Sequence, residues 1–275
     1  MVSPKSSKSS ASPPLLAGFG LTKSFGDFTA NRDIDFTIYP GELHALLGEN
    51  GAGKSTFVKM IYGLLQPDSG YFEWQGKPIH FSNPQEARAA GIGMVFQHFS
   101  LFEAMSVVEN IALALPPEFS KEGLPELIEK KSAEYGIPLR PHSLVADLSV
   151  GEQQRVEIMR CLLQDPALLI MDEPTSVLTP QETQQLFDVL GKLAKQGCAV
   201  LFISHKLEEI KQLTSRATIL RGGEKIAEVD TQTKSAKQLA ELMVGTKIAA
   251  IKPPVAPKNA PAIMQITGLS RPADG

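Results

Sequence analysis

The sequence predicts an α/β fold with a mainly parallel central sheet, an antiparallel β subdomain and a helical subdomain. Apolar, strand-like segments alternate with helix-like segments over most of the 275 residues, which favours a parallel sheet with helices on both faces. Segments 15–39 and 70–81 read as short strands that predict an antiparallel layer beside this sheet. Residues 98–164, about a quarter of the chain, are dominated by helical patterns and predict the helical subdomain.

The first third of the chain supplies the antiparallel layer and opens the parallel sheet. Strands are expected at 15–21 and 32–39, the second because Ile34, Phe36 and Ile38 alternate with polar residues. The expected elements that follow are a strand at 42–48, a helix at 54–63, a hairpin at 70–81, a short helix at 84–91 and a strand at 92–97.

The remaining elements continue the alternation. Thr179, Pro180 and Glu182 predict a helix start, because they supply an N-cap, a proline at the first helical position and a capping-box glutamate. The predicted elements are helices at 106–115, 123–136 and 149–164, a strand at 167–172, a helix at 180–196, a strand at 198–204, a strand pair over 217–229 that turns at Gly222-Gly223, and a helix at 235–244.

Composition places limits on the class of protein. The formal net charge of −3 gives no basic footprint, so no nucleic-acid partner is expected. No apolar run reaches the roughly 18 to 20 residues of a membrane span. Cys161 and Cys198 lie in apolar surroundings without C-x-x-C spacing and are interpreted as buried thiols of a reducing compartment. A cytoplasmic protein is therefore expected.

The two ends differ in composition from the middle. Residues 1–14 are rich in Ser, Pro and Lys and predict a disordered tail. Residues 249–262 are rich in Pro, Ala and Lys and predict a linker after a folded unit at 15–248. Residues 263–275 repeat the pattern of the first strand, and taken alone they fit a frayed end or the start of a new unit equally well.

The segment GENGAGKST, residues 48–56, matches the phosphate-loop pattern G-x-x-x-x-G-K-[ST] at every fixed position. Its glycines allow backbone amides to turn toward phosphates, Lys54 adds a charge, and the Ser55 hydroxyl can bind Mg²⁺. The strand before it and the helix after it are the context that the motif needs. The predicted nucleotide-binding residues are Gly48, Glu49, Asn50, Gly51, Ala52, Gly53, Lys54, Ser55 and Thr56.

Polar residues at other strand ends predict the chemistry around this loop. Asp172 follows an apolar strand and is suited to Mg²⁺, and Glu173 is placed to polarise a water that attacks a γ-phosphate. Gln97 ends a strand and is predicted to reach both Mg²⁺ and that water, and His205 is predicted to contact the γ-phosphate. Taken alone, either would more commonly be an ordinary loop or capping residue. Their position at the carboxyl ends of strands supports a role in ligand binding, because α/β sheets bind ligands there.

A second segment, DLSVGEQQRVE at 147–157, also has the character of a phosphate site. Ser149 and Glu152 predict a capping box at a helix N-terminus that carries a hydroxyl and a glycine. Phe25, in KSFGD, is a candidate platform for adenine, although alone it would more commonly be a core or turn residue.

These motifs, in the order GENGAGKS, Gln97, LSVGE, LLIMDE and His205, resemble the nucleotide-binding subunit of an ATP-binding-cassette (ABC) transporter. The resemblance covers roughly residues 15–246. It implies an ATPase of the P-loop NTPase cassette fold that uses ATP and Mg²⁺, with Glu173, His205 and Gln97 as catalytic residues and Ser55, Gln97 and Asp172 as Mg²⁺ ligands. It further implies that two cassettes pack head to tail, so that Ser149 and Gly151 contact the partner's ATP.

A finer resemblance, carried by LSVGEQQRVEI, DEPTSVLTPQE and LAELMVG, is to importers of simple sugars and nucleosides. In that group one polypeptide usually carries two cassettes, which makes residues 263–275 the expected start of a second, truncated cassette. The implied partners are that second cassette, integral membrane permease subunits and, indirectly, a substrate-binding lipoprotein. The implied location is the cytoplasmic face of the bacterial inner membrane.

Three residues depart from the general family pattern. Val150 replaces the first glycine of the signature, Glu152 replaces glutamine, and Thr179 stands where an aspartate is usual. Two other functions were weighed: a non-transport ABC ATPase that acts on ribosomes or DNA, and a P-loop kinase. The linker lacks the strongly basic or coiled-coil character expected of the first, and the signature, Glu173 and His205 speak against the second.

Overall fold

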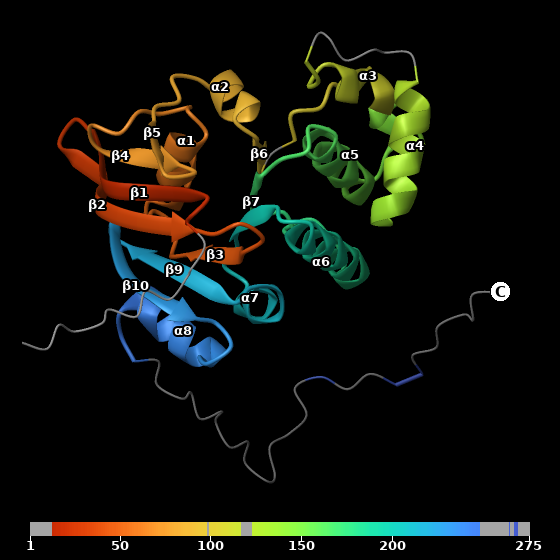
Figure 1. Ribbon diagram of the computed structural model, residues 1–275. Coiled ribbons are helices and arrows are strands. Elements are labelled where there is room, and N and C mark those ends of the chain that lie inside the picture. Colours follow the sequence, from red (N-terminus) through yellow and green to blue (C-terminus); the bar gives the residue numbers. More distant parts are fainter. Residues whose placement is uncertain (1–12, 98, 117–122, 248–263, 265–266, 269–275) are drawn as a thin grey trace, which may run out of the picture.

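The computed structural model describes residues 13–97, 99–116, 123–247, 264 and 267–268, and two sheets organise them (Figure 1). The smaller sheet is antiparallel, in the order β2-β1-β4-β5. It confirms the predicted antiparallel layer. Its strands are β1 (Leu16–Phe25), β2 (Phe28–Ile38), β4 (Ser69–Trp74) and β5 (Lys77–Ile79).

The larger sheet has six strands in the order β10-β9-β3-β8-β7-β6. All neighbouring pairs are parallel except β9 and β10, which form an antiparallel hairpin around Gly222 and Gly223. The mainly parallel sheet of the prediction is therefore confirmed. Its strands are β3 (Leu43–Leu47), β6 (Ile92–Val95), β7 (Leu168–Asp172), β8 (Ala199–Ile203), β9 (Arg216–Arg221) and β10 (Glu224–Asp230).

Helices cover both faces of the larger sheet (Figure 1). On β7, Leu168 and Ile170 face one hydrophobic core, and Leu169 and Met171 face a second, because side chains alternate along a strand. The first core includes α1 and the antiparallel sheet, and the second includes α3 to α8. The helices are α1 (Lys54–Ile61), α2 (Pro84–Ala89), α3 (Val107–Ala112), α4 (Leu124–Tyr135), α5 (Val150–Leu162), α6 (Pro180–Lys195), α7 (Leu207–Leu213) and α8 (Ala236–Val244).

The helical subdomain consists of α3, α4 and α5, which lie together to one side of the sheets in Figure 1. Its side chains join the core of the parallel sheet rather than forming a separate core, since Val107, Ile128 and Val156 belong to the same cluster as Met171. The predicted capping boxes are present at α5, with Ser149 and Glu152, and at α6, with Thr179 and Glu182.

The structure corrects several predicted boundaries. The strand predicted at 92–97 ends at Val95, because β6 is an edge strand whose last paired residue is Val95, opposite Met171. The strands predicted at 15–21 and 32–39 both extend further than predicted toward the turn between them, because β1 and β2 form a hairpin in which Phe25 pairs with Phe28. Helix α7 was missed, although Leu207, Ile210 and Leu213 recur at helical spacing; its start has no side-chain cap.

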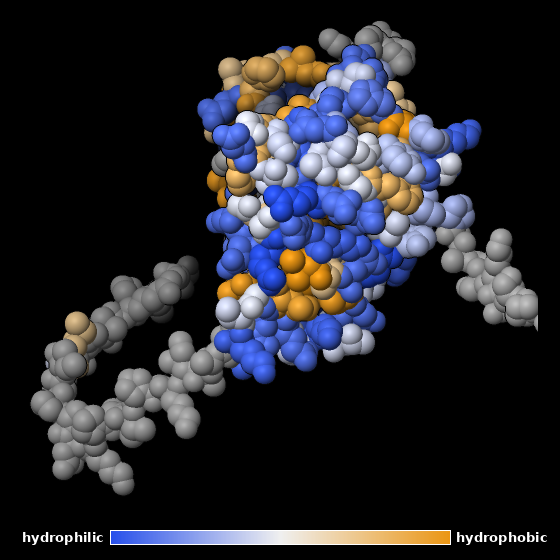
Figure 2. All heavy atoms as spheres, turned by 90° about the vertical axis from the view of Figure 1, so that its left-hand side faces the viewer, coloured by the Kyte–Doolittle hydropathy of each residue, from blue (hydrophilic) through white to orange (hydrophobic). Residues whose placement is uncertain are grey.

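Figure 2 shows a mainly hydrophilic face on which hydrophobic side chains gather in a few separate places. Within the described residues, none of the helices has the length and hydrophobicity needed to cross a bilayer. The tail predicted at 1–14, the linker at 249–262 and the segment at 263–275 lie almost entirely outside the described residues.

Candidate functional site

A single cavity of about 980 Å³ collects most of the predicted site residues. It lies at the carboxyl edge of the parallel strands, where open α/β sheets bind ligands, and its volume falls in the range of ligand cavities. Its lining comprises Phe28, Ala30, Gly48, Glu49, Asn50, Gly51, Gly53, Lys54, Ser55, Thr56, Gln97, Asp172, Glu173, His205 and Met243.

The phosphate loop joins β3 to α1 and forms the floor of this cavity. Gly51 and Gly53 have φ of 81° and 98°, values that only glycine adopts readily. The N-terminus of α1 has no side-chain cap, which it shares with α4 and α7. Amide N–H groups in the first turn of α1 therefore have no side-chain acceptor, which leaves them available for an anion.

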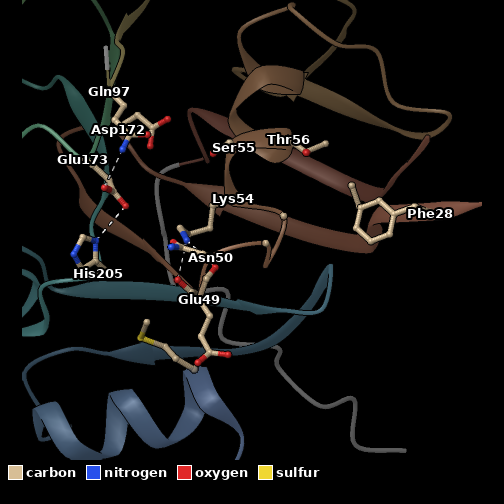
Figure 3. Close-up of a pocket in the computed structure, with 15 residues that line it drawn as sticks. Phe28, Glu49, Asn50, Lys54, Ser55, Thr56, Gln97, Asp172, Glu173 and His205 are labelled. Carbon is tan, nitrogen blue, oxygen red and sulfur yellow. Dashed lines mark hydrogen bonds and ion pairs between the residues drawn. The ribbon is translucent and has the colours of Figure 1, made fainter. Parts of the chain in front are cut away.

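Lys54 is buried at the first position of α1, and its ammonium lies at the cavity (Figure 3). Its Nζ donates hydrogen bonds to the carbonyls of Gly48, at 2.8 Å, and Glu49, at 3.0 Å. Burial lowers the pKa of Lys54, and the carboxylates of Glu173 and Asp172 oppose that effect. A phosphate in the cavity would supply the counter-charge that offsets the lost hydration of this ammonium.

The oxygen donors near the loop fit Mg²⁺. Asp172 ends β7, and burial raises the pKa of its carboxyl, with Glu173 adding to the rise and Lys54 opposing it. A divalent cation would remove this penalty for the carboxylate. Ser55 and Gln97 line the same cavity and complete a hydroxyl, amide and carboxylate set of the kind that Mg²⁺ prefers. The described part of the chain has no cluster of three or more His, Cys, Asp or Glu side chains that could hold a metal ion, so the proposed Mg²⁺ ligands here include a hydroxyl and an amide.

Glu173 joins the three predicted catalytic residues into one hydrogen-bonded group (Figure 3). Gln97 Nε2 donates to one carboxylate oxygen at 3.4 Å, and His205 Nδ1 lies 3.2 Å from the other. Glu173 has a φ of 49°, and left-handed backbone at a non-glycine residue is concentrated at functional sites. Gln97 and His205 each lie two residues beyond a strand, so the structure places them in loops rather than at the strand ends that the sequence predicted.

Phe28 is the aromatic residue that lines the cavity, and Phe25, the predicted platform for adenine, lies opposite it across the hairpin turn; that role of Phe25 stays a prediction. Both flank the turn of the β1–β2 hairpin and pair with each other, and both are largely exposed. Phe28 lines the cavity on the side away from His205 (Figure 3). Phe25 is not among the lining residues, and the Lys23 ammonium lies 5.7 Å from the centre of its ring.

The signature segment lies outside this cavity. Ser149 caps α5 through Glu152, and Val150 is exposed. Gly151 is buried at this helix start, where an added Cβ would collide with the carboxylate of Glu182 on α6. Ser149 does not line the cavity of its own chain. Contact with the nucleotide of a partner would require such a position, and that contact stays a prediction.

Sequence reasoning missed three residues of the cavity wall: Phe28, Ala30 and Met243. Phe28 and Ala30 precede the strand that was predicted to begin at residue 32 and therefore belong to no predicted element. Met243 comes from α8, nearly two hundred residues after the phosphate loop, and only tertiary packing brings it there. A hydrophobic residue on an amphipathic helix gives no sequence signal for such a position.

A comparison with protein-family models matches residues 31–176 to the family described as ABC transporter. The matched range contains the phosphate loop, Gln97, the signature and the paired acids Asp172 and Glu173.

Curated relatives are named as import proteins. The nucleoside import ATP-binding protein NupA of Lactococcus lactis subsp. cremoris is 40% identical over 268 residues, which are 94% of this chain and 52% of NupA. The glucose import ATP-binding protein TsgD13 of Haloferax volcanii is 40% identical over 267 residues, 86% of this chain and 48% of the relative. The ribose import ATP-binding protein RbsA 2 of Burkholderia cenocepacia is 40% identical over 262 residues, 93% of this chain and 52% of the relative. The chain thus spans about half the length of these relatives.

Solved structures show the same fold. The ADP conformation of MJ1267, an ATP-binding cassette of an ABC transporter, superposes with a TM-score of 0.73 at 25% identity, over 84% of this chain and 95% of that one. A nucleotide-free ATP-binding cassette from an ABC transporter superposes with a TM-score of 0.74 at 24% identity. The superposition covers 85% of this chain and 96% of that one.

Proposed function

Since the chain belongs to the ABC transporter family, we propose that it binds and hydrolyses ATP to power a membrane importer, and that the cargo is a nucleoside or a simple sugar. The observation that carries the proposal is the cavity in which Lys54, the uncapped start of α1 and the Gln97–Glu173–His205 group meet. The names of the relatives supply the class of cargo and favour an importer over a ribosome- or DNA-acting ATPase or a kinase.

Each residue has a distinct role in this proposal. Lys54 and the first amides of α1 bind the phosphates of ATP, and the aromatic pair Phe25 and Phe28 at the turn of the β1–β2 hairpin provides the surface for the base, with Phe25 as the predicted platform for adenine. Ser55, Gln97 and Asp172 hold Mg²⁺, which when bound neutralises charge on the phosphates. Glu173 accepts a proton from the attacking water, while Gln97 orients that water and His205 lies toward the γ-phosphate end.

The hydrogen bonds to Glu173 support its role as the base. Because Gln97 and His205 each engage a different oxygen of this carboxylate, the side chain is fixed before water arrives. Both neighbours belong to loops, so a small movement of either loop would change the orientation of the carboxylate. The rate of ATP hydrolysis would then depend on the protein segments that contact the loops of Gln97 and His205.

The partners follow from the family and from the position of the signature. A second cassette, in the same longer polypeptide or as a second copy, would present its signature to this cavity, and Ser149 and Gly151 would serve the cavity of the partner. Permease subunits would receive the motion, a substrate-binding lipoprotein would act further out, and the protein would lie on the cytoplasmic face of the bacterial inner membrane. The cassette occupies 15–248, with a tail at 1–14, a linker at 249–262 and the start of a second cassette at 263–275.

Replacing Lys54 by alanine tests the phosphate site. The variant should lose detectable binding of ADP with Mg²⁺ in calorimetry, because the ammonium and its position at the loop are both removed. Lys59→Ala, which removes an exposed lysine from the same helix, is the matched control and should bind ADP like the unmodified chain. Equal affinity in the two variants would overturn the assignment of the cavity to a nucleotide.

A further inference from the structure

Two backbone carbonyls of the phosphate loop are held from outside the loop. The amide N–H of Gly223, in the β9–β10 turn, donates to the carbonyl of Ala52 at 3.3 Å. The side chain of Asn31, on β2, donates from Nδ2 to the carbonyl of Gly53 at 3.2 Å. The same Gly53 carbonyl accepts the first hydrogen bond of α1, from the amide of Phe57 at 2.9 Å. The loop is thus fixed by a strand and a turn that lie elsewhere in the sequence.

Holding a carbonyl also orients the amide that follows it. A trans peptide is planar, and its C=O and the N–H of the next residue point in opposite directions. A Gly53 carbonyl held against Asn31 therefore directs the N–H of Lys54 away from β2, and an Ala52 carbonyl held against Gly223 does the same for the N–H of Gly53. These are amides of the kind that a phosphate loop offers to a nucleotide.

The contact between Asn31 and Gly53 is close. An added Cβ on Gly53 would lie 2.5 Å from Asn31 Nδ2 and would also collide with the carbonyl of Ala30. The glycine therefore serves two purposes, since it permits the φ of 98° and lets β2 approach the loop. Ala30 lines the cavity wall next to Asn31, so one strand sets both the wall and the loop.

Asn31 is an unusual residue for its surroundings. It is fully buried, and its Oδ1 has no hydrogen-bond partner among the described residues. A buried amide with one unsatisfied end is a poor choice for stability, and an apolar side chain of the same size would avoid that cost. The hydrogen bond that it does make goes to the phosphate loop.

We infer that Asn31 is a positioning residue of the nucleotide site, which acts through Gly53 to orient the amides of the phosphate loop. The inference rests on the proposed function, because it gives those amides a phosphate to bind. Asn31 does not line the cavity and touches no nucleotide in this account.

Asn31→Leu is the test, because leucine keeps the branched shape and the number of side-chain heavy atoms and removes the donor. The variant should fold as stably as the unmodified chain or more stably, yet its Kd for ADP with Mg²⁺ should rise about tenfold, equivalent to about 1.4 kcal/mol. The ratio of the AMP to the ADP dissociation constant should fall, because the contact acts on the phosphates. Asn31→Ala removes the same donor without any risk of overpacking and should show the same changes.

Asn110→Leu is the matched control. Asn110 is also buried, but its amide bonds to the carbonyls of Phe102 and Ser106 in the helical subdomain. Loss of these hydrogen bonds in Asn110→Leu should lower the melting temperature and leave the affinity of the folded chain for ADP unchanged.

The possible outcomes separate this inference from the proposed function. If both Asn31 variants bind ADP and AMP with unchanged affinities while Lys54→Ala does not bind, the cavity is a nucleotide site and Asn31 does not position it. If the affinity of the Asn31 variants falls equally for ADP and AMP, the effect is general loosening and the inference fails. If the unmodified chain binds no nucleotide, the proposed function fails, and the inference about Asn31 fails with it.

Discussion

At the scale of single residues, Glu173 is the side chain that contacts both Gln97 and His205. Its backbone is left-handed, its amide continues the sheet by donating to the carbonyl of Ile203 at 2.9 Å, and its two carboxylate oxygens face Gln97 and His205. The strand thus fixes the backbone while two loops fix the side chain. This combination of a left-handed backbone with contacts from two separate loops supports the proposed role of Glu173 as the base.

Glu173→Gln should separate binding from turnover. The amide keeps the size of the side chain and can still bond to its neighbours, but it cannot accept a proton from water. Phosphate release from ATP should fall by a factor on the order of 100 or more, while the affinity for nucleotide stays within a few-fold of its original value. Glu129→Gln, an exposed acid on α4, should leave both unchanged. Near-normal turnover in the Glu173 variant would remove it as the base.

At the scale of elements, α5 and α6 are joined at their first turns. One oxygen of Glu182 accepts hydrogen bonds from the amide and hydroxyl of Thr179, both at 2.9 Å, and the other lies 3.4 Å from Arg155 on α5. Gly151 packs against the same carboxylate. The signature helix and the helix that follows Glu173 are therefore connected through one side chain, and Thr179 has a structural role because it holds that side chain.

Thr179→Ala should lower the free energy of unfolding by about 1 kcal/mol, because it removes the N-cap of α6. Thr179→Asp should keep most of this stability, since aspartate is an equally good cap. Urea unfolding of the two variants beside the unmodified chain provides the measurement. If alanine and aspartate behave alike, the cap does not contribute to stability.

The same comparison has a predicted pH dependence. The hydrogen bonds from Thr179 lower the pKa of Glu182 below its usual value of 4.5. A carboxyl whose pKa is lower in the folded state stabilises the fold above the pKa of the unfolded chain and loses that contribution as the pH falls through the folded value. The stability gap between the unmodified chain and Thr179→Ala should therefore narrow in acid.

At the scale of the whole molecule, the phosphate loop and the signature lie on different parts of the surface. The cavity opens beside β3, β7 and β8, and Ser149 begins α5 in the helical subdomain (Figure 1). One copy thus does not bring its own signature to its own cavity. If the signature takes part in hydrolysis, the complete site is formed between two cassettes.

Mixing two inactive variants tests this arrangement. Lys54→Ala removes nucleotide binding, and Ser149→Asp keeps the N-cap of α5 but places a carboxylate where a partner's phosphate would lie. Each alone should be inactive, and an equal mixture should recover about a quarter of the unmodified rate, because half of randomly formed pairs are mixed and each mixed pair has one complete site. A mixture as inactive as its components would argue against pairing in trans.

Much of the fold could be predicted because its signals are local. Continuous apolar runs marked β7 and β8, which are buried on both faces, and capping residues marked the start of α5 and α6. Helix α7 lacked a side-chain cap and was missed, and the end of β6 was misplaced because the length of an edge strand depends on its neighbour. Such boundaries depend on pairing, which a single segment does not reveal.

The sequence by itself determined the α/β class, the phosphate loop and the order of the motifs, because each is a short pattern whose chemistry depends on neighbouring residues. Only the tertiary structure decided that Glu173 bridges Gln97 and His205, that Phe28 rather than Phe25 lines the cavity, and that Asn31 holds Gly53. These relations join β2, β7 and loops that lie far apart in the sequence, as Gln97 and Glu173 do at a separation of 76 residues. Their distances follow from strand order, register and twist, which arise only when the two sheets pack together.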